Sequence, residues 1–236
     1  MAQVQLSNPG PTQNRHGSGV HARHSVAPVV EAAGITKAYR SGGWPLGRRA
    51  PVLVDARLTL YPGEVVGLVG ENGSGKSTLM KILVGALSAD AGSVRRLGSV
   101  GYCPQEPLVY GRLTCAEHLE LFGRAYGLTD ADALRRSGEI FEALGFATYR
   151  RTRADRLSGG TLAKLNLAIA LLPDPDVLML DEPYAGFDWD TYLRFWQLVE
   201  ERREGGKSVL IVSHFVVDEH RFTRIVEVRD GGAWPR

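Results

Sequence analysis

The sequence predicts an α/β fold with a mainly parallel sheet, and three short apolar runs carry the prediction. Residues 65–69, 177–180 and 208–212 are almost entirely apolar, which is typical of parallel strands that other elements cover on both faces. Helical patterns lie between the runs. In residues 192–199 the apolar side chains recur at helical spacing, and Gly205 and Gly206 end that pattern. Strands that alternate with helices predict a parallel sheet flanked by helices.

Two further regions depart from this alternation. Residues 29–35 contain the edges of short strands, and residues 52–61 alternate like a half-buried strand, so we expect a small antiparallel β subdomain on the N-terminal side. The segment from about 106 to 164 has no long apolar run but has helical stretches at 115–126 and 130–144. We expect it to be a helical subdomain inserted between two core strands.

Length and composition fit one globular domain preceded by a polar tail. Of the 236 residues 44% are hydrophobic and 23% charged, and the formal net charge of +2 gives no sign of a surface that neutralises nucleic-acid phosphates. We therefore expect no nucleic-acid partner. No apolar run reaches the roughly 18 residues of a membrane-spanning helix. Residues 1–28 are polar and predict a disordered tail, and residues 29–236 predict the folded domain.

A glycine-rich loop follows the first apolar run. Residues 70–77 read GENGSGKS, which fits the phosphate-binding pattern GxxxxGK[ST], between a predicted strand and a predicted helix. Glycines let backbone N–H groups turn toward an anion, and the positive end of the helix faces the same point. Lys76 supplies a charge for the β- and γ-phosphates, and the Ser77 hydroxyl can bind Mg²⁺. We predict a nucleotide site formed by Gly70, Glu71, Asn72, Gly73, Ser74, Gly75, Lys76, Ser77 and Thr78.

The second apolar run ends on two carboxylates, Asp181 and Glu182. Ligands of open α/β folds gather at this edge of the sheet. Asp181 is placed to hold Mg²⁺, and Glu182 can accept or orient the proton of the water that attacks the γ-phosphate. Alone, such a pair also fits a helix N-cap. Together with the glycine-rich loop, it favours the catalytic interpretation.

One segment distinguishes among the many kinds of P-loop NTPase. Residues 157–161 read LSGGT and resemble the LSGGQ signature of ATP-binding cassette (ABC) proteins, in the order along the chain that this family shows. A serine hydroxyl and two glycines at a helix start form a second anion cradle, which makes sense if it closes over ATP held by a second copy. An ordinary serine N-cap is the alternative. The predicted nucleotide contacts are Leu157, Ser158, Gly159 and Gly160.

The resemblance covers about residues 29–232 and assigns roles to four further positions. Tyr39 matches the aromatic residue that stacks on adenine, and Gln105 matches the glutamine that touches Mg²⁺ and links the core to the helical subdomain. Asp188 matches the aspartate that acts across the dimer, and it also fits a cap of the following helix. His214 matches the histidine that contacts the γ-phosphate. The resemblance thus implies a catalytic set (Lys76, Glu182, His214) and a metal-binding set (Ser77, Gln105, Asp181).

Similarity to the ABC family also implies a function. The expected protein is an ATPase that uses ATP and Mg²⁺, pairs with a second ABC nucleotide-binding subunit as a homodimer or heterodimer, and powers transport through a separate transmembrane permease subunit. Its expected location is the cytoplasm, on the inner face of the cell membrane. Residues 108–126 resemble drug, polysaccharide or lipid exporter cassettes, which favours export. A non-transport ABC ATPase and a catalytically weak regulatory cassette in a heterodimer are the alternatives.

Several positions depart from the family pattern. Thr161 stands where the signature has glutamine, and Lys164 and Ile169 stand where arginines are usual. After the two carboxylates, Tyr184 and Phe187 replace a small hydroxyl residue and a leucine. None of these changes removes a residue with a predicted charge or proton role, so we expect an active enzyme.

Overall fold

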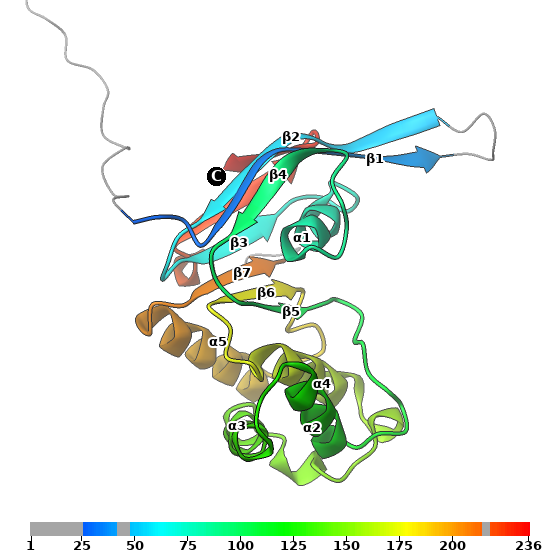
Figure 1. The fold of residues 1–236 in the computed structure, drawn as a ribbon, viewed down its shortest axis with the longest axis vertical. Coiled ribbons are helices and arrows are strands. Elements are labelled where there is room, and N and C mark those ends of the chain that lie inside the picture. Colours follow the sequence, from blue (N-terminus) through cyan, green and yellow to red (C-terminus); the bar gives the residue numbers. More distant parts are fainter. Residues whose placement is uncertain (1–25, 42–47, 214–217) are drawn as a thin grey trace, which may run out of the picture.

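The computed structural model describes residues 26–41, 48–213 and 218–236. Within these ranges a three-stranded sheet and helix α1 lie on one side of a six-stranded sheet, and helices α2 to α5 lie on the other (Figure 1). The molecule is therefore layered, with the larger sheet in the middle, as the α/β prediction requires.

The six-stranded sheet is parallel except at one edge. Its order is β5 (Val100–Cys103), β6 (Val177–Asp181), β7 (Ser208–Val212), β3 (Val65–Val69), β8 (Arg224–Arg229) and β9 (Gly232–Pro235), and only β8 and β9 pair antiparallel. Every residue of β3, β6 and β7 is buried, which confirms the strands predicted from the three apolar runs. The sequence did not predict β5, β8 or β9.

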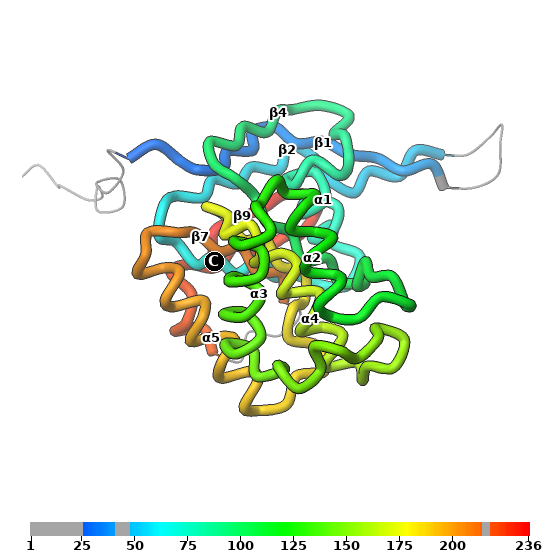
Figure 2. Tube along the Cα trace, turned by 60° about the horizontal axis from the view of Figure 1, so that its bottom comes forward, coloured from blue at the N-terminus to red at the C-terminus, as the bar shows by residue number. Residues whose placement is uncertain are grey.

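The three-stranded sheet is antiparallel, in the order β2 (Arg48–Leu60), β1 (Val30–Ser41), β4 (Ala91–Arg96), and confirms the predicted β subdomain. The far ends of β1 and β2 extend beyond the body as an arm (Figures 1 and 2). The prediction of short strands at residues 29–35 was wrong, because β1 is one strand of 12 residues. Gly34 has a φ of +68°, and the pairing register shifts between Ala32 and Ile35, so a bulge interrupts the alternation by which a long strand is recognised.

Five α-helices occur in the described residues: α1 (Lys76–Val84), α2 (Cys115–Ala125), α3 (Asp130–Ala143), α4 (Gly159–Leu171) and α5 (Trp189–Glu204). α2, α3 and the start of α4 fall within residues 106–164, and they form a lobe on the far side of the larger sheet from β1 and β2 (Figures 1 and 2). The last four helices each begin after a side chain that accepts a backbone N–H from three residues on (Thr114, Thr129, Ser158 and Asp188). Such caps stabilise a helix start by about 1 kcal/mol.

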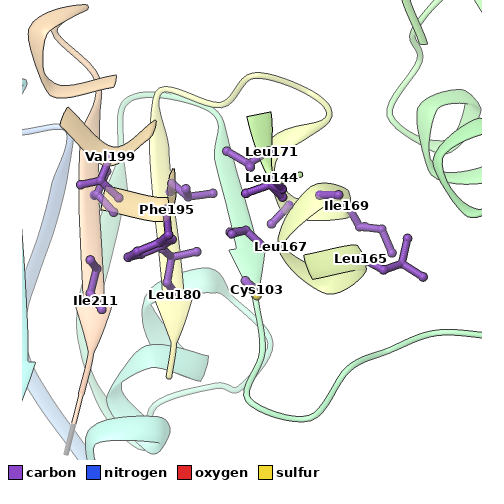
Figure 3. Packing of buried hydrophobic residues seen from close by; sticks show 14 of the residues in the cluster. Cys103, Leu144, Leu165, Leu167, Ile169, Leu171, Leu180, Phe195, Val199 and Ile211 are labelled. Carbon is purple, nitrogen blue, oxygen red and sulfur yellow. The ribbon is translucent and has the colours of Figure 1, made fainter. Parts of the chain in front are cut away.

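The core forms on both faces of the larger sheet. On one face Leu180 and Ile211 pack against Phe195 of α5 and Leu167 of α4 (Figure 3). On the other face, residues of β3, β6 and β7 pack against α1 and the three-stranded sheet. Consecutive residues of β3 face alternate clusters, so each is covered, and each large apolar side chain contributes about 1.5–3 kcal/mol on full burial. This double coverage explains the unbroken apolar runs.

Two further features of the described residues concern the membrane and the cysteines. None of the helices in the described ranges combines the length and apolar character that crossing a membrane requires. Cys103 and Cys115 are free and buried. Burial raises the pKa of Cys103 to about 12 and that of Cys115 to about 11, so both remain protonated thiols at neutral pH.

Candidate nucleotide-binding site

The glycine-rich loop connects the end of β3 to the start of α1, and two of its glycines are fixed by close packing. A Cβ on Gly70 would lie 2.3 Å from the carbonyl oxygen of Val228, and one on Gly75 would lie 3.0 Å from that of Val52. Both glycines, like Gly73, have positive φ angles that side chains disfavour. The loop can therefore take this tight turn only with glycine at these positions.

Lys76, the first residue of α1, folds back over this loop. Only 5% of the residue is exposed, and its Nζ donates to the carbonyl oxygens of Gly70 and Glu71, both at 2.8 Å. Burial lowers the pKa of Lys76, and the carboxylates of Glu182 and Asp181 oppose that shift. These electrostatic effects show that the two acids at the end of β6 lie close enough to act on the ammonium group.

The two carboxylates differ in backbone conformation. Asp181 is the last residue of β6 and is buried. Glu182 has a φ of +53°, and its N–H donates to the carbonyl oxygen of Val212 at 3.1 Å. A left-handed conformation in a residue other than glycine costs on the order of 1–3 kcal/mol and is concentrated at active sites. The strained turn directs the chain away from the sheet directly after Asp181.

A cavity of about 510 Å³ gathers most of the predicted residues, and its size suits a small-molecule ligand. It is lined by Tyr39, Val52, Asn72, Gly73, Gly75, Lys76, Ser77, Thr78, Gln105 and Glu182. These residues come from β1, β2, the glycine-rich loop, α1 and the segments that follow β5 and β6. The structure thus brings together residues from the three-stranded sheet and from segments that follow β3, β5 and β6 of the larger sheet.

Tyr39 and Val52 form the end of the cavity nearest the β1–β2 arm. The Tyr39 ring is partly exposed, and its Oη lies 3.4 Å from the Thr78 Oγ1. An exposed aromatic face beside a phosphate loop can stack on a planar base. Val52 was not predicted as a site residue. Its place in the alternating strand 52–61 was the available signal, but only the register between β1 and β2 puts it beside the loop.

Several side-chain oxygen atoms in and beside the cavity fit Mg²⁺. Ser77, Gln105 and Glu182 line the same cavity, and Asp181 directly precedes Glu182. Hydroxyl, amide and carboxylate oxygens are the hard donors that Mg²⁺ prefers, usually together with substrate phosphates. Ser77, Gln105 and Asp181 are the residues that would hold it.

The signature segment lies apart from this cavity. The Ser158 Oγ accepts the N–H of Thr161 at 3.3 Å and lies 2.9 Å from the Thr161 hydroxyl, so Ser158 is the N-cap of its own helix. None of the described residues 157–160 lines the 510 Å³ cavity. A Cβ on Gly160 would lie 2.5 Å from the Gly186 carbonyl oxygen, whereas one on Gly159 would meet no described atom within 4 Å. Gly160 is closed in by its own chain, and Gly159 faces open space.

The structure tests one predicted role of Asp188 and none of His214. Asp188 caps α5, because its Oδ1 accepts the Thr191 N–H at 2.8 Å, and hydrogen bonds from Thr191 lower the pKa of Asp188. The capping role is therefore confirmed, and the role across a dimer stays a prediction. His214 lies outside the described residues, directly after Ser213.

Tyr184 and Phe187, the two aromatic residues that differ from the family pattern, pack against helix α5. The ring of Tyr184 lies 5.5 Å from that of Phe195, and the ring of Phe187 lies 6.3 Å from the same side chain. Burial raises the pKa of Tyr184, and a hydrogen bond with Ser213 opposes that effect. The larger residues thus join the loop after Glu182 to α5 and to the end of β7.

Comparison with known proteins gives the family. The family model described as ABC transporter matches residues 53–185, which include the glycine-rich loop, the signature and both carboxylates. The chain belongs to the ABC transporter family. This result confirms the predicted family, and the fold is the one expected of its ATP-binding cassettes.

Two relatives and one solved structure illustrate the relationship. The chain is 38% identical over 198 residues to the zinc import ATP-binding protein ZnuC of Chelativorans sp. (strain BNC1), a match that covers 82% of this chain and 65% of that protein. It is 30% identical over 200 residues to the linearmycin resistance ATP-binding protein LnrL of Bacillus subtilis (strain 168), covering 80% of this chain and 62% of that protein. The chain thus spans less than two thirds of the length of either relative.

The fold is similar to that of a dimeric ATP-binding cassette solved in a post-hydrolysis state with ADP and Pi. The TM-score is 0.79 at 24% sequence identity, and the match covers 86% of this chain and 96% of that one. This likeness concerns the fold, and it extends over nearly the whole cassette.

Proposed function

We propose that this ABC cassette binds ATP with Mg²⁺, hydrolyses ATP to ADP and phosphate, and thereby powers transport through a separate transmembrane subunit. One observation carries the proposal. Lys76, Ser77, Gln105 and Glu182 come from different elements of the sheet and line one cavity of about 510 Å³. A cation, a hydroxyl, an amide and a carboxylate at one point are the groups that phosphoryl transfer to water uses.

Each group has a place in the reaction. The Tyr39 ring stacks on the base, while the loop N–H groups and Lys76 hold the phosphates. Ser77, Gln105 and Asp181 would hold Mg²⁺, which would neutralise phosphate charge. Glu182, at the strained end of β6, orients the attacking water and accepts its proton. The fixed positions of these groups lower the barrier, because little reorganisation is left for the reaction itself.

The signature completes the site of a second copy. Ser158 and Gly159 lie outside this chain's own cavity, and Gly159 faces open space, so both are available to a nucleotide held by a partner. The helix start there offers backbone N–H groups and a positive dipole to phosphate. We infer a dimer in which each ATP lies between one glycine-rich loop and the partner's signature, and a similar fold has been solved as a dimer with ADP and Pi.

Residues 106–112 are the surface we propose for the transmembrane subunit. Leu108 is 70% exposed and Tyr110 is 59% exposed, close to Gln105 in the chain. The segment is fixed to helix α2, because the Tyr110 N–H donates to Nε2 of the buried His118 at 2.8 Å. Fixed, exposed apolar residues next to a nucleotide-sensing glutamine suit a contact that passes movement to a partner. Export is the direction that the resemblance of residues 108–126 favours.

Nucleotide titration and turnover of the full chain test the proposal. We expect MgATP to displace a fluorescent ATP analogue, phosphate to be released over many turnovers, and the protein to form dimers when ATP is present. With the transmembrane subunit in inside-out vesicles, we expect ATP-dependent uptake of substrate if the transporter is an exporter. A folded protein that takes up no ATP would contradict the proposal.

A further inference from the structure

A buried amide joins helix α4 to the segment that carries Gln105. Asn166, in the middle of α4, is only 5% exposed. Its Nδ2 donates to the carbonyl oxygen of Pro104 at 2.7 Å and lies 3.2 Å from the Cys103 Sγ. Pro104 is 62 positions away in the sequence and directly precedes Gln105. The contact therefore joins helix α4 to the end of strand β5.

The hydrogen bonds to the strand end account for an asparagine at this position. It is a poorer helix former than alanine or leucine, and its neighbours Leu165 and Leu167 belong to the apolar core. A buried amide without partners destabilises a protein, whereas one that is hydrogen-bonded fixes the groups it binds. The amide protons of Asn166 are directed to the strand end, so fixing that strand end is what the residue does.

A second contact shows that α4 and β5 form one unit. A Cβ on Gly101 would lie 2.3 Å from the carbonyl oxygen of Ala170, so the strand touches the helix backbone one turn beyond Asn166. At its other end α4 begins with Ser158 as N-cap. Ser158 and Asn166 are about 12 Å apart along the helix axis, at ~1.5 Å per residue. Helix α4 thus begins at the signature and contacts the neighbour of Gln105 through Asn166.

We propose that Asn166 is a positioning residue for Gln105, because its amide fixes the strand end from which Gln105 reaches the cavity. The Asn166 hydrogen bond holds the Pro104 carbonyl and thereby limits where the side chain of Gln105 lies in the cavity. The inference rests on the proposed function of Gln105.

A double-mutant cycle on the full chain tests this role. We measure kcat, KM for MgATP and ATP affinity for Asn166→Ala, for Gln105→Ala and for the double variant. Loss of one buried hydrogen bond used in the transition state lowers kcat by about fivefold. We expect that loss in Asn166→Ala with ATP affinity unchanged, and no further loss when Asn166→Ala is added to Gln105→Ala. Asn166→Leu, which keeps the volume and fills the core, should behave like Asn166→Ala.

Ser137→Ala is the matched control. Ser137 is also a buried polar residue of a lobe helix, but its hydroxyl bonds only within α3, to the Ala133 carbonyl oxygen, so we expect wild-type kcat. Two results would overturn this inference and leave the proposed function intact. The first is an equal loss of kcat from Asn166→Ala in the wild type and in Gln105→Ala. The second is wild-type kcat in both Asn166→Ala and Asn166→Leu while Gln105→Ala is impaired. Wild-type kcat in Gln105→Ala would overturn the role of Gln105 and, with it, the inference.

Discussion

The glycine-rich loop and the signature both use a helix start as an anion cradle, but only the first is complete within one chain. The loop surrounds the ammonium group of Lys76 and borders a cavity. The carboxylate of Glu182 and the amide of Gln105, which follow other strands, line the same cavity. The signature presents Gly159 to open space, and the hydroxyl of Ser158 caps its own helix. The glycine-rich loop is complete within one chain, whereas the signature is open. We infer that the signature binds a nucleotide held by another molecule.

The difference also appears in what fixes the glycines. Gly70 and Gly75 cannot carry a side chain because their own chain lies too close, and the same holds for Gly160. Gly159 alone among the signature glycines has room for one. If position 159 requires glycine, the reason is therefore a contact with a partner molecule. Substitutions that affect one cradle and spare the other therefore test this difference.

The largest effect is expected from Glu182→Gln. This change keeps the shape of the side chain at the strained turn but removes the proton acceptor, so turnover should fall by about 10³-fold, within the range for a lost general base. ATP affinity should remain, and dimers should accumulate because ATP is no longer removed. Phosphate release and mass measurement in solution check both results. Undiminished turnover would show that another group activates the water.

Lys76→Ala should affect the first cradle most. The ammonium inside the loop makes charge-assisted bonds to phosphate, and its loss should weaken ATP binding by about 10²-fold. Lys81→Ala is the matched control, since Lys81 is exposed on the last turn of the same helix and should leave affinity unchanged. Titration with a fluorescent ATP analogue measures both. Equal affinities for the two variants would remove Lys76 from the site.

The two signature glycines should respond differently to alanine. Gly159→Ala meets no described atom, so its melting temperature should equal or exceed that of the wild type, while turnover falls by about tenfold because the methyl group obstructs the partner's phosphates. Gly160→Ala meets the Gly186 carbonyl oxygen at 2.5 Å and should lower the melting temperature. Thermal unfolding and turnover together distinguish the two. Wild-type turnover in Gly159→Ala would make the signature an ordinary helix cap.

Alkaline pH should give the smallest effect, and only the first cradle should respond. The pKa of Lys76 lies below 10.5, so ATP affinity should begin to fall before that pH, as the ammonium loses its proton. Between the lowered pKa and 10.5 the unfolded chain holds more protons than the folded one, so this group raises the free energy of unfolding as pH increases. Lys76→Arg keeps its charge and should abolish both trends. Parallel trends in Lys76→Arg would assign them to other groups.

The sequence predicts those features of the fold and site that are local in the chain. β3, β6 and β7 were predictable because both of their faces are covered, and the glycine-rich loop and Asp181 because each directly follows such a strand. β5 has four residues with Gly101 among them, and β8 includes Arg224, Glu227 and Arg229, so neither shows an apolar run. Hydrophobic pattern alone does not reveal such strands.

Features that depend on distant contacts could not be predicted. Val52 lines the cavity because β2 pairs with β1 in a register that the sequence does not state. Asn166 fits a helix pattern, and its importance is visible only once Pro104 lies beside it. The left-handed backbone of Glu182 has no sequence signal either, since glutamate rarely adopts it.

Mixing two impaired variants, Lys76→Ala and Gly159→Ala, tests the shared site most directly. Lys76→Ala lacks a working loop but keeps the signature, and Gly159→Ala has the reverse defect. In an equal mixture half of the dimers contain one variant of each kind, and each of these has one intact site, so turnover should recover to about a quarter of the wild-type value. If the mixture shows no more turnover than the average of the two variants measured separately, each chain works alone and the account is contradicted.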